Sequence, residues 1–550
     1  MYIMPGGMWR TCAIWSTVID QLKSHDASRP RTGTVFKALL TRFSPVRQNI
    51  VANLAGNGAT AIATLLCTPI YVRLLGIESY GLIGVYMTLQ TLSIFLDMGL
   101  GTTINREIAR LSVGQDSSQE MRNLVRTLEV VYWLFGAVIC VGIVALAPLV
   151  VNNWLHLDRI TPSEGTQAIR LAGLAIGLRW PLTLYSGGMM GLQRQVSLNG
   201  ILGASAIVQS VGAVIVLRVI GPTISVFFVW QIVMAIVPSI WARQSLLRCL
   251  PVALDRAVFT PSAIWSLWRF TAGAGAFTLT SMLLNQVDKL ALSKMASLES
   301  FGYYNLAGVA ANAIYRLVGP VFSALFPLFS GLVNGNELKR LTSSYHKGCE
   351  LVSLLIFPAT AVGVVFSESI LLVWTRNAQT SMATHTTMSF LVAGSAVNAL
   401  IYVPYALQLA YGWTTLGVYM NVFGLVSAGA FLPFTISHYG ASGAAAVKLL
   451  VSCVVFAVGP CVMHRRILRG ETWRWYVSDV AKPFAVSFAV ALACAGVAEG
   501  FKMGNRPQWF EVVFLLAVFL LTSVSTILAV KGARLPTSLW PNRLLGWIRQ

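Results

Sequence analysis

Residues 78–81 read Glu-Ser-Tyr-Gly, and residues 299–302 read Glu-Ser-Phe-Gly, an offset of 221 positions. Each tetrapeptide leads into a long apolar stretch. At the same offset Glu129 aligns with Glu350, and each lies at the start of a further apolar stretch. Agreement in register over this distance predicts an internal duplication, in which two copies of one structural unit follow each other along the chain.

The composition of the chain is that of a membrane protein. Of its 550 residues, 56% are hydrophobic and 11% are charged, whereas a soluble globular chain carries about 25% charged residues. This much apolar surface requires lipid as part of the solvent. The net charge of +20 would suit nucleic acid. Most Lys and Arg flank apolar stretches, however, so we expect a lipid bilayer and no nucleic acid as a partner.

Fourteen stretches are apolar over the length, about 20 residues, that a transmembrane helix requires. They cover residues 49–74, 80–101, 128–151, 168–189, 196–217, 222–242, 268–293, 303–332, 349–373, 386–408, 416–436, 441–463, 480–498 and 510–530. The predicted fold class is therefore an all-α polytopic membrane protein with about fourteen transmembrane helices. The fourth and seventh stretches are the weakest, because they contain Arg179 and the pair Asp288-Lys289.

The duplication and the spans together predict the domains. Residues 49–243 form an N-lobe of six helices, and residues 264–463 form a C-lobe of six helices. Six helices separate the repeats, so both copies have the same orientation in the membrane. This predicts two lobes with a substrate cavity between them. The two helices within 480–530 fall outside the repeat.

The basic residues predict how these helices are oriented. Of the Lys and Arg outside the predicted spans or near their ends, 28 lie on one side of the membrane and 8 on the other. Because cytoplasmic loops are enriched in Lys and Arg, the basic tails 1–48 and 531–550 are both predicted to be cytoplasmic. The loops on the other side are too short to fold as a catalytic domain, so we expect a transporter and not an enzyme.

Polar side chains follow one face of the first helix of each copy. Asn57 and Thr64 belong to the first stripe, and Asn285, which is aligned with Thr64, belongs to the second. Such residues also form contacts between membrane helices, so packing and the lining of a cavity are both open for the first stripe. The charged pair after Asn285 favours a cavity for the second.

Basic residues inside the predicted spans are candidates for substrate binding, because charge at depth is costly and usually faces a wet interior. They are Arg179, Lys289, Arg316 and Lys448, and Asn312 shares the helical face of Arg316. Fixed cations compensate for the lost hydration of phosphate, so this set predicts an anionic substrate. For Lys448, near a span end, snorkelling to the interface is the alternative.

Acidic residues and cysteines are few. Asp288 is the deepest acid and Asp97 closes the second predicted helix, so these two are the candidates for ion coupling; for Asp97 a structural role is the alternative. The eight cysteines contain no CxxC and lie mainly in apolar stretches. We therefore predict no metal site and no cofactor.

Four stretches of the sequence also match the pattern of a known family. They are Asn49–Gly76 running into Tyr80-Gly81, Asp97-Met98-Gly99-Leu100-Gly101, Asn285–Lys294, and Phe301-Gly302-Tyr303-Tyr304-Asn305-Leu306-Ala307. On these stretches the chain resembles, over residues 47–530, the Wzx-type polysaccharide flippases of O-antigen and exopolysaccharide synthesis. That family lies within a larger group that includes lipid II flippases and MATE exporters.

The resemblance implies a function and a location. The substrate would be an oligosaccharide repeat unit linked to undecaprenyl pyrophosphate, moved across the bacterial inner membrane by alternating access. The sugars and the pyrophosphate would pass through the cavity while the prenyl tail stays in lipid. A polysaccharide polymerase and a chain-length regulator are the further partners that such a role implies.

Three other functions are open to a chain of this class. A MATE-like multidrug antiporter needs twelve helices and prefers acids in its cavity, which the two additional helices and the basic residues disfavour. A lipid II flippase has fourteen helices, but the Arg-rich pattern expected in its first helices does not occur. A membrane glycosyltransferase or polymerase would need paired acids or a large external loop, and the sequence contains neither.

Overall fold

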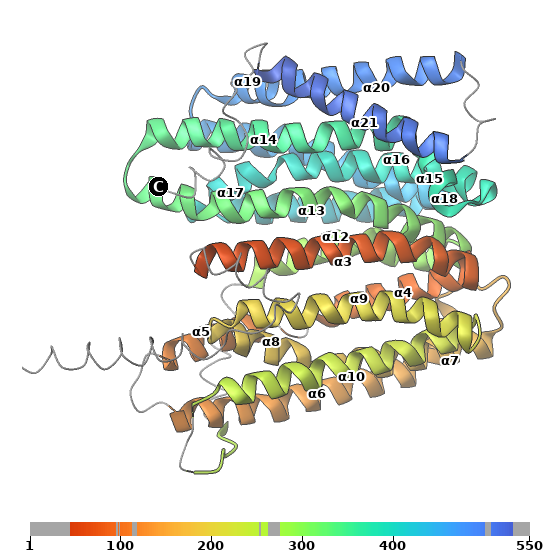
Figure 1. Cartoon of the computed structure of the whole chain (residues 1–550), viewed down its shortest axis with the longest axis vertical. Helices are drawn as coiled ribbons and strands as arrows, with labels where there is room; N and C mark the ends of the chain where they lie inside the picture. Colours follow the sequence, from red (N-terminus) through yellow and green to blue (C-terminus); the bar gives the residue numbers. More distant parts are fainter. Residues whose placement is uncertain are drawn as a thin grey trace, which may run out of the picture. The chain divides into compact units, whose positions relative to one another are not determined.

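The part of the chain that the structure describes is built almost entirely of helices, as the apolar stretches predict (Figure 1). The computed structural model describes residues 45–94, 97, 99–112, 118–251, 255–261, 275–500 and 508–531. The predicted tails, apart from residues 45–48 and 531, and the side chain of Asn57 lie outside the described part. Residues 54–550 form one compact unit, and the contacts described below belong to it.

The helices follow one another with short connections. They are α3 (Pro45–Leu75), α4 (Ile77–Ile94), α5 (Leu100–Leu111), α6 (Ser118–Asn153), α7 (Pro162–Arg179), α8 (Pro181–Gly191), α9 (Gln195–Val219), α10 (Ile224–Cys249), α12 (Gly275–Met295), α13 (Leu298–Asn334), α14 (Leu338–Val365), α15 (Ser367–Thr375), α16 (Ala378–Leu400), α17 (Tyr402–Ala410), α18 (Thr415–Arg466), α19 (Thr472–Arg474), the π-helix η2 (Trp475–Ala481), α20 (Lys482–Gly500) and α21 (Gln508–Lys531).

Ten helices in the described residues are long and apolar enough to cross a membrane. Each overlaps at least one predicted span, which confirms that the chain is an all-helical, multi-pass membrane protein. The predicted spans 80–101, 168–189 and 268–293 overlap described helices that are not among the ten. The first two are each divided between two shorter helices, and the third carries Asp288 and Lys289. The count of fourteen spans stays a prediction.

Helix α18 contains two predicted spans and folds back on itself. Gly440, with φ 56° and ψ −130°, interrupts its helical backbone, in a conformation that favours glycine. A Cβ atom placed on Gly424 would lie 3.1 Å from Val451 Cγ1, although 27 residues of straight helix would separate these positions by about 40 Å. The segments before and after Gly440 therefore form an antiparallel hairpin, in agreement with the predicted break between 436 and 441.

Two of the predicted spans are interrupted for identifiable reasons. Pro181 begins α8 directly after α7, because proline has no N–H to continue the hydrogen bonds of a helix. The span predicted at 80–101 stops at Ile94, and α5 starts anew after Gly99, whose φ is 85°. The Asp97 carboxylate accepts a hydrogen bond from the Gly101 N–H at 3.1 Å. Asp97 therefore satisfies a free backbone donor in the first turn of α5.

The helices pack in two groups, which we call the first helix group (α4–α10) and the second helix group (α12–α18). Within the first, α7 packs on α6 and α10; within the second, α16 and α12 pack on α18, and α13 packs on α16. Helices α20 and α21 pack on each other and on α14 (Figure 1). Among the described helices, α4 makes the main contacts between the groups, with α13 and α12.

Candidate functional site

The contact between the two helix groups is built from the repeated tetrapeptide. Gly81 of α4 packs on the backbone carbonyl of Leu298, and Gly302 of α13 packs on the backbone carbonyl of Ile77; a Cβ atom on either glycine would collide with that oxygen. Gly81 and Gly302 stand 221 positions apart, and so do Ile77 and Leu298, which is the offset of the predicted duplication. The two contacts are therefore reciprocal, as the predicted duplication would require.

A third contact joins two equivalent positions directly. A Cβ atom on Gly84 would collide with the side-chain amide of Asn305, and these residues are also 221 positions apart. The same offset therefore relates the two sides of all three contacts, as an internal two-fold axis between α4 and α13 would require. We call the contacts of Ile77, Gly81, Gly84, Leu298, Gly302 and Asn305 the glycine seal.

Further contacts between the groups lie at the same end of the helices. The Leu298 N–H donates to the His156 carbonyl at 2.9 Å, and Trp154 Nε1 donates to Ser293 Oγ at 3.0 Å. Helix α3 joins the second group at this end too: Arg73 Nε donates to the Thr375 carbonyl at 2.7 Å.

The buried Glu78 carboxylate holds the loop that reaches across from the first group. It accepts hydrogen bonds from the N–H groups of Asp158 at 2.7 Å and Arg159 at 2.9 Å. The first residue of the tetrapeptide thus orders the loop that carries His156, and the last residue packs on the partner helix.

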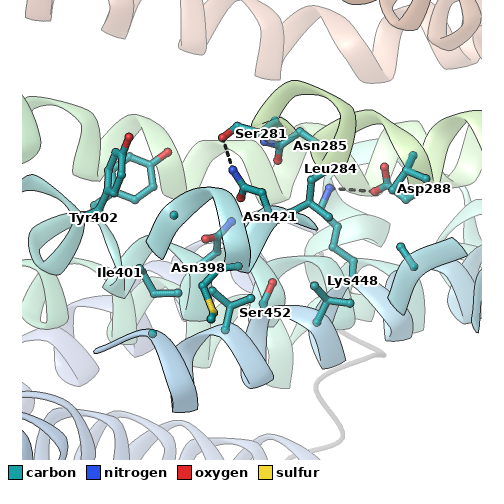
Figure 2. A pocket seen from close by; sticks show the side chains of 18 of the residues that line it. Ser281, Leu284, Asn285, Asp288, Asn398, Ile401, Tyr402, Asn421, Lys448 and Ser452 are labelled. Carbon is teal, nitrogen blue, oxygen red and sulfur yellow. Dashed lines mark hydrogen bonds and ion pairs between the residues drawn. The ribbon is translucent and has the colours of Figure 1, made fainter. Parts of the chain in front are cut away.

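A cavity of about 350 Å³ lies inside the second helix group (Figure 2). Its lining comes from α12, α13, α16, α17 and the hairpin α18, so the break at Gly440 and the return of the chain are needed to form it. Its polar lining residues are Ser281, Asn285, Asp288, Asn398, Tyr402, Tyr405, Gln408, Asn421, Lys448 and Ser452. The volume is at the lower end of the range for ligand pockets, about 300–1,000 Å³.

An ion pair between α12 and α18 lies at one edge of this cavity. Lys448 Nζ is 2.9 Å from Asp288 Oδ2 (Figure 2), and the Tyr304 hydroxyl donates to the same oxygen. Asp288 is buried, so the ammonium and the hydroxyl supply the compensation that a carboxylate needs away from water. Lys448 is thus paired with an acid 160 positions away rather than extended to the interface.

The asparagines of the cavity are held by hydrogen bonds from their amide nitrogens. Asn421 Nδ2 donates to Ser281 Oγ at 2.7 Å (Figure 2), and Asn285 Nδ2 donates to the Ser281 carbonyl at 2.8 Å. Asn398 Nδ2 donates to the Tyr315 hydroxyl at 3.2 Å. These bonds leave the amide oxygens as the groups available to an occupant.

Arg179 lies in the first helix group, apart from this cavity. Its Nη1 donates to Gln209 Oε1 at 3.3 Å, and Gln209 Nε2 donates to Gln231. The network links α7, α9 and α10, and Arg179 remains half-buried. The guanidinium has further donors beyond the one that Gln209 uses.

Arg316 and Asn312 are exposed on one face of α13, and Ser323 continues that face. A polar face with a guanidinium in the middle of an apolar span is unfavourable against lipid, so we expect this face to meet a wet space. Lys289 is half-buried and is not among the residues that line the cavity of the second group. Arg179 and Arg316 thus lie apart from the two lysines, whereas Lys289 follows Asp288, the acid that pairs with Lys448, and lies near that ion pair.

Two remaining candidates have local bonding partners. The Thr64 hydroxyl donates to the carbonyl of Thr60 in its own helix at 2.9 Å. Asp97 is buried and accepts from the Tyr132 hydroxyl at 2.5 Å in addition to the Gly101 N–H. These bonds favour packing for Thr64 and a structural role for Asp97.

The sequence did not single out the residues of α16 and α17 in the cavity. Asn398, Tyr402, Tyr405 and Gln408 lie in an apolar stretch. Polar residues of this kind are common between membrane helices. The usable signal was their spacing of three or four, which places them near one helical face.

Comparison with known proteins gives a consistent picture. The model of a family described as "Polysaccharide biosynthesis protein" matches residues 46–333. A "Putative O-antigen transporter" of Shigella flexneri is 23% identical over 417 residues, which cover 72% of this chain and 93% of that protein. A lipid II flippase, MurJ, in an inward closed conformation superposes with a TM-score of 0.66 at 12% identity, over 86% of this chain and 98% of that one. An inward-facing MATE multidrug transporter superposes with a TM-score of 0.60 at 14% identity, over 75% and 98%. The fold is thus the one these two transporters share.

Proposed function

This chain belongs to the polysaccharide biosynthesis protein family, and from that premise we propose that it is a flippase for undecaprenyl-pyrophosphate-linked oligosaccharide repeat units in the bacterial inner membrane. The proposal agrees with the similarity to an O-antigen transporter and to a lipid II flippase, which are transporters and not enzymes. The proposed transport supplies repeat units for the synthesis of a surface polysaccharide.

The proposed mechanism rests mainly on the contacts of the glycine seal. Transporters of this kind move two repeats against each other around a fixed cavity. The contacts Gly81–Leu298 and Gly302–Ile77 are symmetric and gather with the other contacts between the groups at one end. We propose that the two helix groups are the two lobes, that this end is the periplasmic one, and that the state described here is closed to the periplasm.

Two arginines supply the anion-binding part of the proposal. Arg316 on α13 and Arg179 on α7 belong to different lobes, and a guanidinium binds phosphate oxygens through paired N–H groups. We propose that both face the space between the lobes and contact the pyrophosphate. The charge of Lys448 is compensated by Asp288, so Lys448 contributes less to the binding of the pyrophosphate. A coupling cation at Asp288 would have to displace that ammonium.

Depletion of the protein should leave the lipid-linked oligosaccharide on the cytoplasmic leaflet, where a lectin reaches it only after spheroplasts are permeabilised. We expect the native chain to restore surface glycan, and Arg316→Ala and Arg179→Ala to lower it at least about tenfold, since a charged hydrogen bond is worth about 1.5–3 kcal/mol. Lys at either site should restore part of the export, because the positive charge remains although the paired N–H donors of the guanidinium are lost.

The matched control is Arg218→Ala, which removes an exposed arginine near the end of α9 and should leave export unchanged. Equal protein levels of all variants are checked by immunoblot. Normal glycan with both Arg316→Ala and Arg179→Ala would remove these residues from the mechanism. Lipid II accumulation or loss of dye resistance on depletion, with normal glycan, would instead support the lipid II flippase or the multidrug antiporter.

Reporter fusions test the orientation. The bias of 28 to 8 basic residues predicts that a phosphatase fused at Gly335 is inactive in the cytoplasm, and that one fused at Gly504 is active in the periplasm. A fluorescent protein that folds only in the cytoplasm should give the opposite pattern. The reverse result at either site would contradict fourteen spans with both termini cytoplasmic.

A further inference from the structure

One buried amide oxygen in the cavity of the second helix group has no hydrogen-bond partner among the described residues. Gln408 of α17 is 4% exposed, and its Oε1 accepts no hydrogen bond within the described part of the chain. It lines the cavity. A buried polar group without a partner costs about 1–3 kcal/mol, so this position favours an occupant that donates hydrogen bonds.

The other amides of the cavity present the same kind of group. The nitrogens of Asn285, Asn398 and Asn421 donate to side-chain or backbone oxygens of the protein. Among the described residues no donor reaches their oxygens. An amide oxygen has two acceptor sites, so the cavity offers several acceptors to a ligand rich in hydroxyl or N–H groups.

Aromatic rings complete one wall of the cavity. Phe322 of α13 meets Tyr402 edge to face, with ring centroids 5.9 Å apart, and lies nearly parallel to Tyr405, with centroids 6.3 Å apart. The faces of such rings are apolar and carry the negative part of the ring quadrupole. They suit the C–H face of a pyranose, whose hydrogens are weakly positive.

The electrostatics of the cavity disfavour an anion. Its one lysine, Lys448, is paired with Asp288, so the lining presents no uncompensated positive charge. A phosphate or carboxylate entering here would lose its hydration without gaining a free cation. The volume of about 350 Å³ also limits the occupant to a small part of an oligosaccharide.

We infer that this cavity binds one uncharged pyranose unit of the transported glycan. Its hydroxyl or N-acetyl N–H groups donate to Gln408 and the asparagine oxygens, and its C–H face packs on Tyr402 and Phe322. The pyrophosphate is bound outside this cavity. The inference rests on the proposed function and extends it, because it divides recognition of sugar and of phosphate between separate places.

The test measures binding to the purified full-length chain in detergent. The probes are methyl glycosides of every sugar found in the hydrolysate of the host's surface polysaccharide, together with methyl glucuronide and inorganic pyrophosphate. We expect at least one uncharged glycoside to raise the Tm and to give a saturable heat in calorimetry. Methyl glucuronide and pyrophosphate should not compete with it.

Gln408→Leu removes the amide at nearly constant shape. Because the unpartnered group is lost, Tm should stay the same or rise, while the affinity for the glycoside should fall about tenfold. The matched control is Gln286→Leu on α12, since Gln286 is also buried with an unpartnered Oε1 but does not line the cavity. It should leave sugar binding unchanged.

Three results would overturn the inference: no uncharged glycoside binds, Gln408→Leu binds it as well as the native chain, or pyrophosphate displaces it. None of them affects the depletion experiment, which measures where the lipid-linked oligosaccharide accumulates. If glycosides bind through Gln408 but depletion leaves the lipid-linked oligosaccharide in its normal place, the sugar site stands and the proposed flippase function fails.

Discussion

Gly302→Ala should lower surface glycan about tenfold while the protein level stays normal. The added methyl group would meet the Ile77 carbonyl in the state described here, so α13 must move away from α4. Overpacking of this kind costs about 1–3 kcal/mol, and each 1.4 kcal/mol changes a population ratio about tenfold. Because Gly81 makes the symmetric contact with Leu298, Gly81→Ala should have a similar effect.

The control for this prediction lies on the same helix. A Cβ atom on Gly308 would find open space, so Gly308→Ala adds the same methyl group to α13 without disturbing the seal. It should export normally.

Labelling reports the conformation directly. With the eight native cysteines replaced, Asn312→Cys on the exposed face of α13 should react slowly with a membrane-impermeant maleimide added from the periplasm. Addition of Gly302→Ala should speed the reaction, because the seal opens on that side. Unchanged labelling together with normal export would show that the glycine seal does not control access.

The positions of the helices could be predicted from the sequence because they follow from local properties. Apolar length locates a span, and a short polar break between 436 and 441 was enough to predict the turn at Gly440. The duplication stays a prediction, but the reciprocal contacts of Gly81 and Gly302 agree with it. The span predicted at 80–101 contains parts of two helices, because the Asp97 carboxylate caps the first turn of α5 through a bond to a residue only four positions away. Hydropathy does not register such a cap.

The packing role of the glycines in the repeated tetrapeptide could have been predicted from the sequence in more detail. Two equivalent helices can approach closely near a symmetry axis when each carries a small residue at the equivalent position. Gly81 and Gly302 satisfy this condition in the sequence. That they pack against each other's helix, and that Gly84 meets Asn305, depends on the docking of the two groups, which no local pattern reveals.

The cavity of the second group was largely beyond prediction for a related reason. Asp288 and Lys448 were recognised separately as buried charges, but 160 positions separate them, and only the hairpin at Gly440 brings α18 back to α12. A cation counted as free in the sequence is thus neutralised in the fold. Gln408 is a second example, because an amide without a partner can be identified only when all its neighbours are known.

The ion pair itself provides the second large expected effect. Removal of one partner of a buried pair leaves an uncompensated charge and costs about 3–5 kcal/mol, whereas replacement of both partners by uncharged residues is often neutral. We therefore expect Asp288→Asn and Lys448→Met, made singly, to reduce folded protein in the membrane and to lower glycan export by more than tenfold. The double variant Asp288→Asn with Lys448→Met should recover most of both.

The exposed pair Arg340–Glu337, with its charged atoms 2.6 Å apart, serves as the control, because surface pairs contribute only about 0–1 kcal/mol. Glu337→Gln should change neither protein level nor export.

If the double variant at Asp288 and Lys448 regains its protein level but not its export, the charges themselves take part in transport, and the proposed coupling role of Asp288 gains support. If both the protein level and the export recover, the pair acts by joining α12 to α18, and a coupling ion would have to bind elsewhere. Full export by either single variant would contradict the burial of the pair.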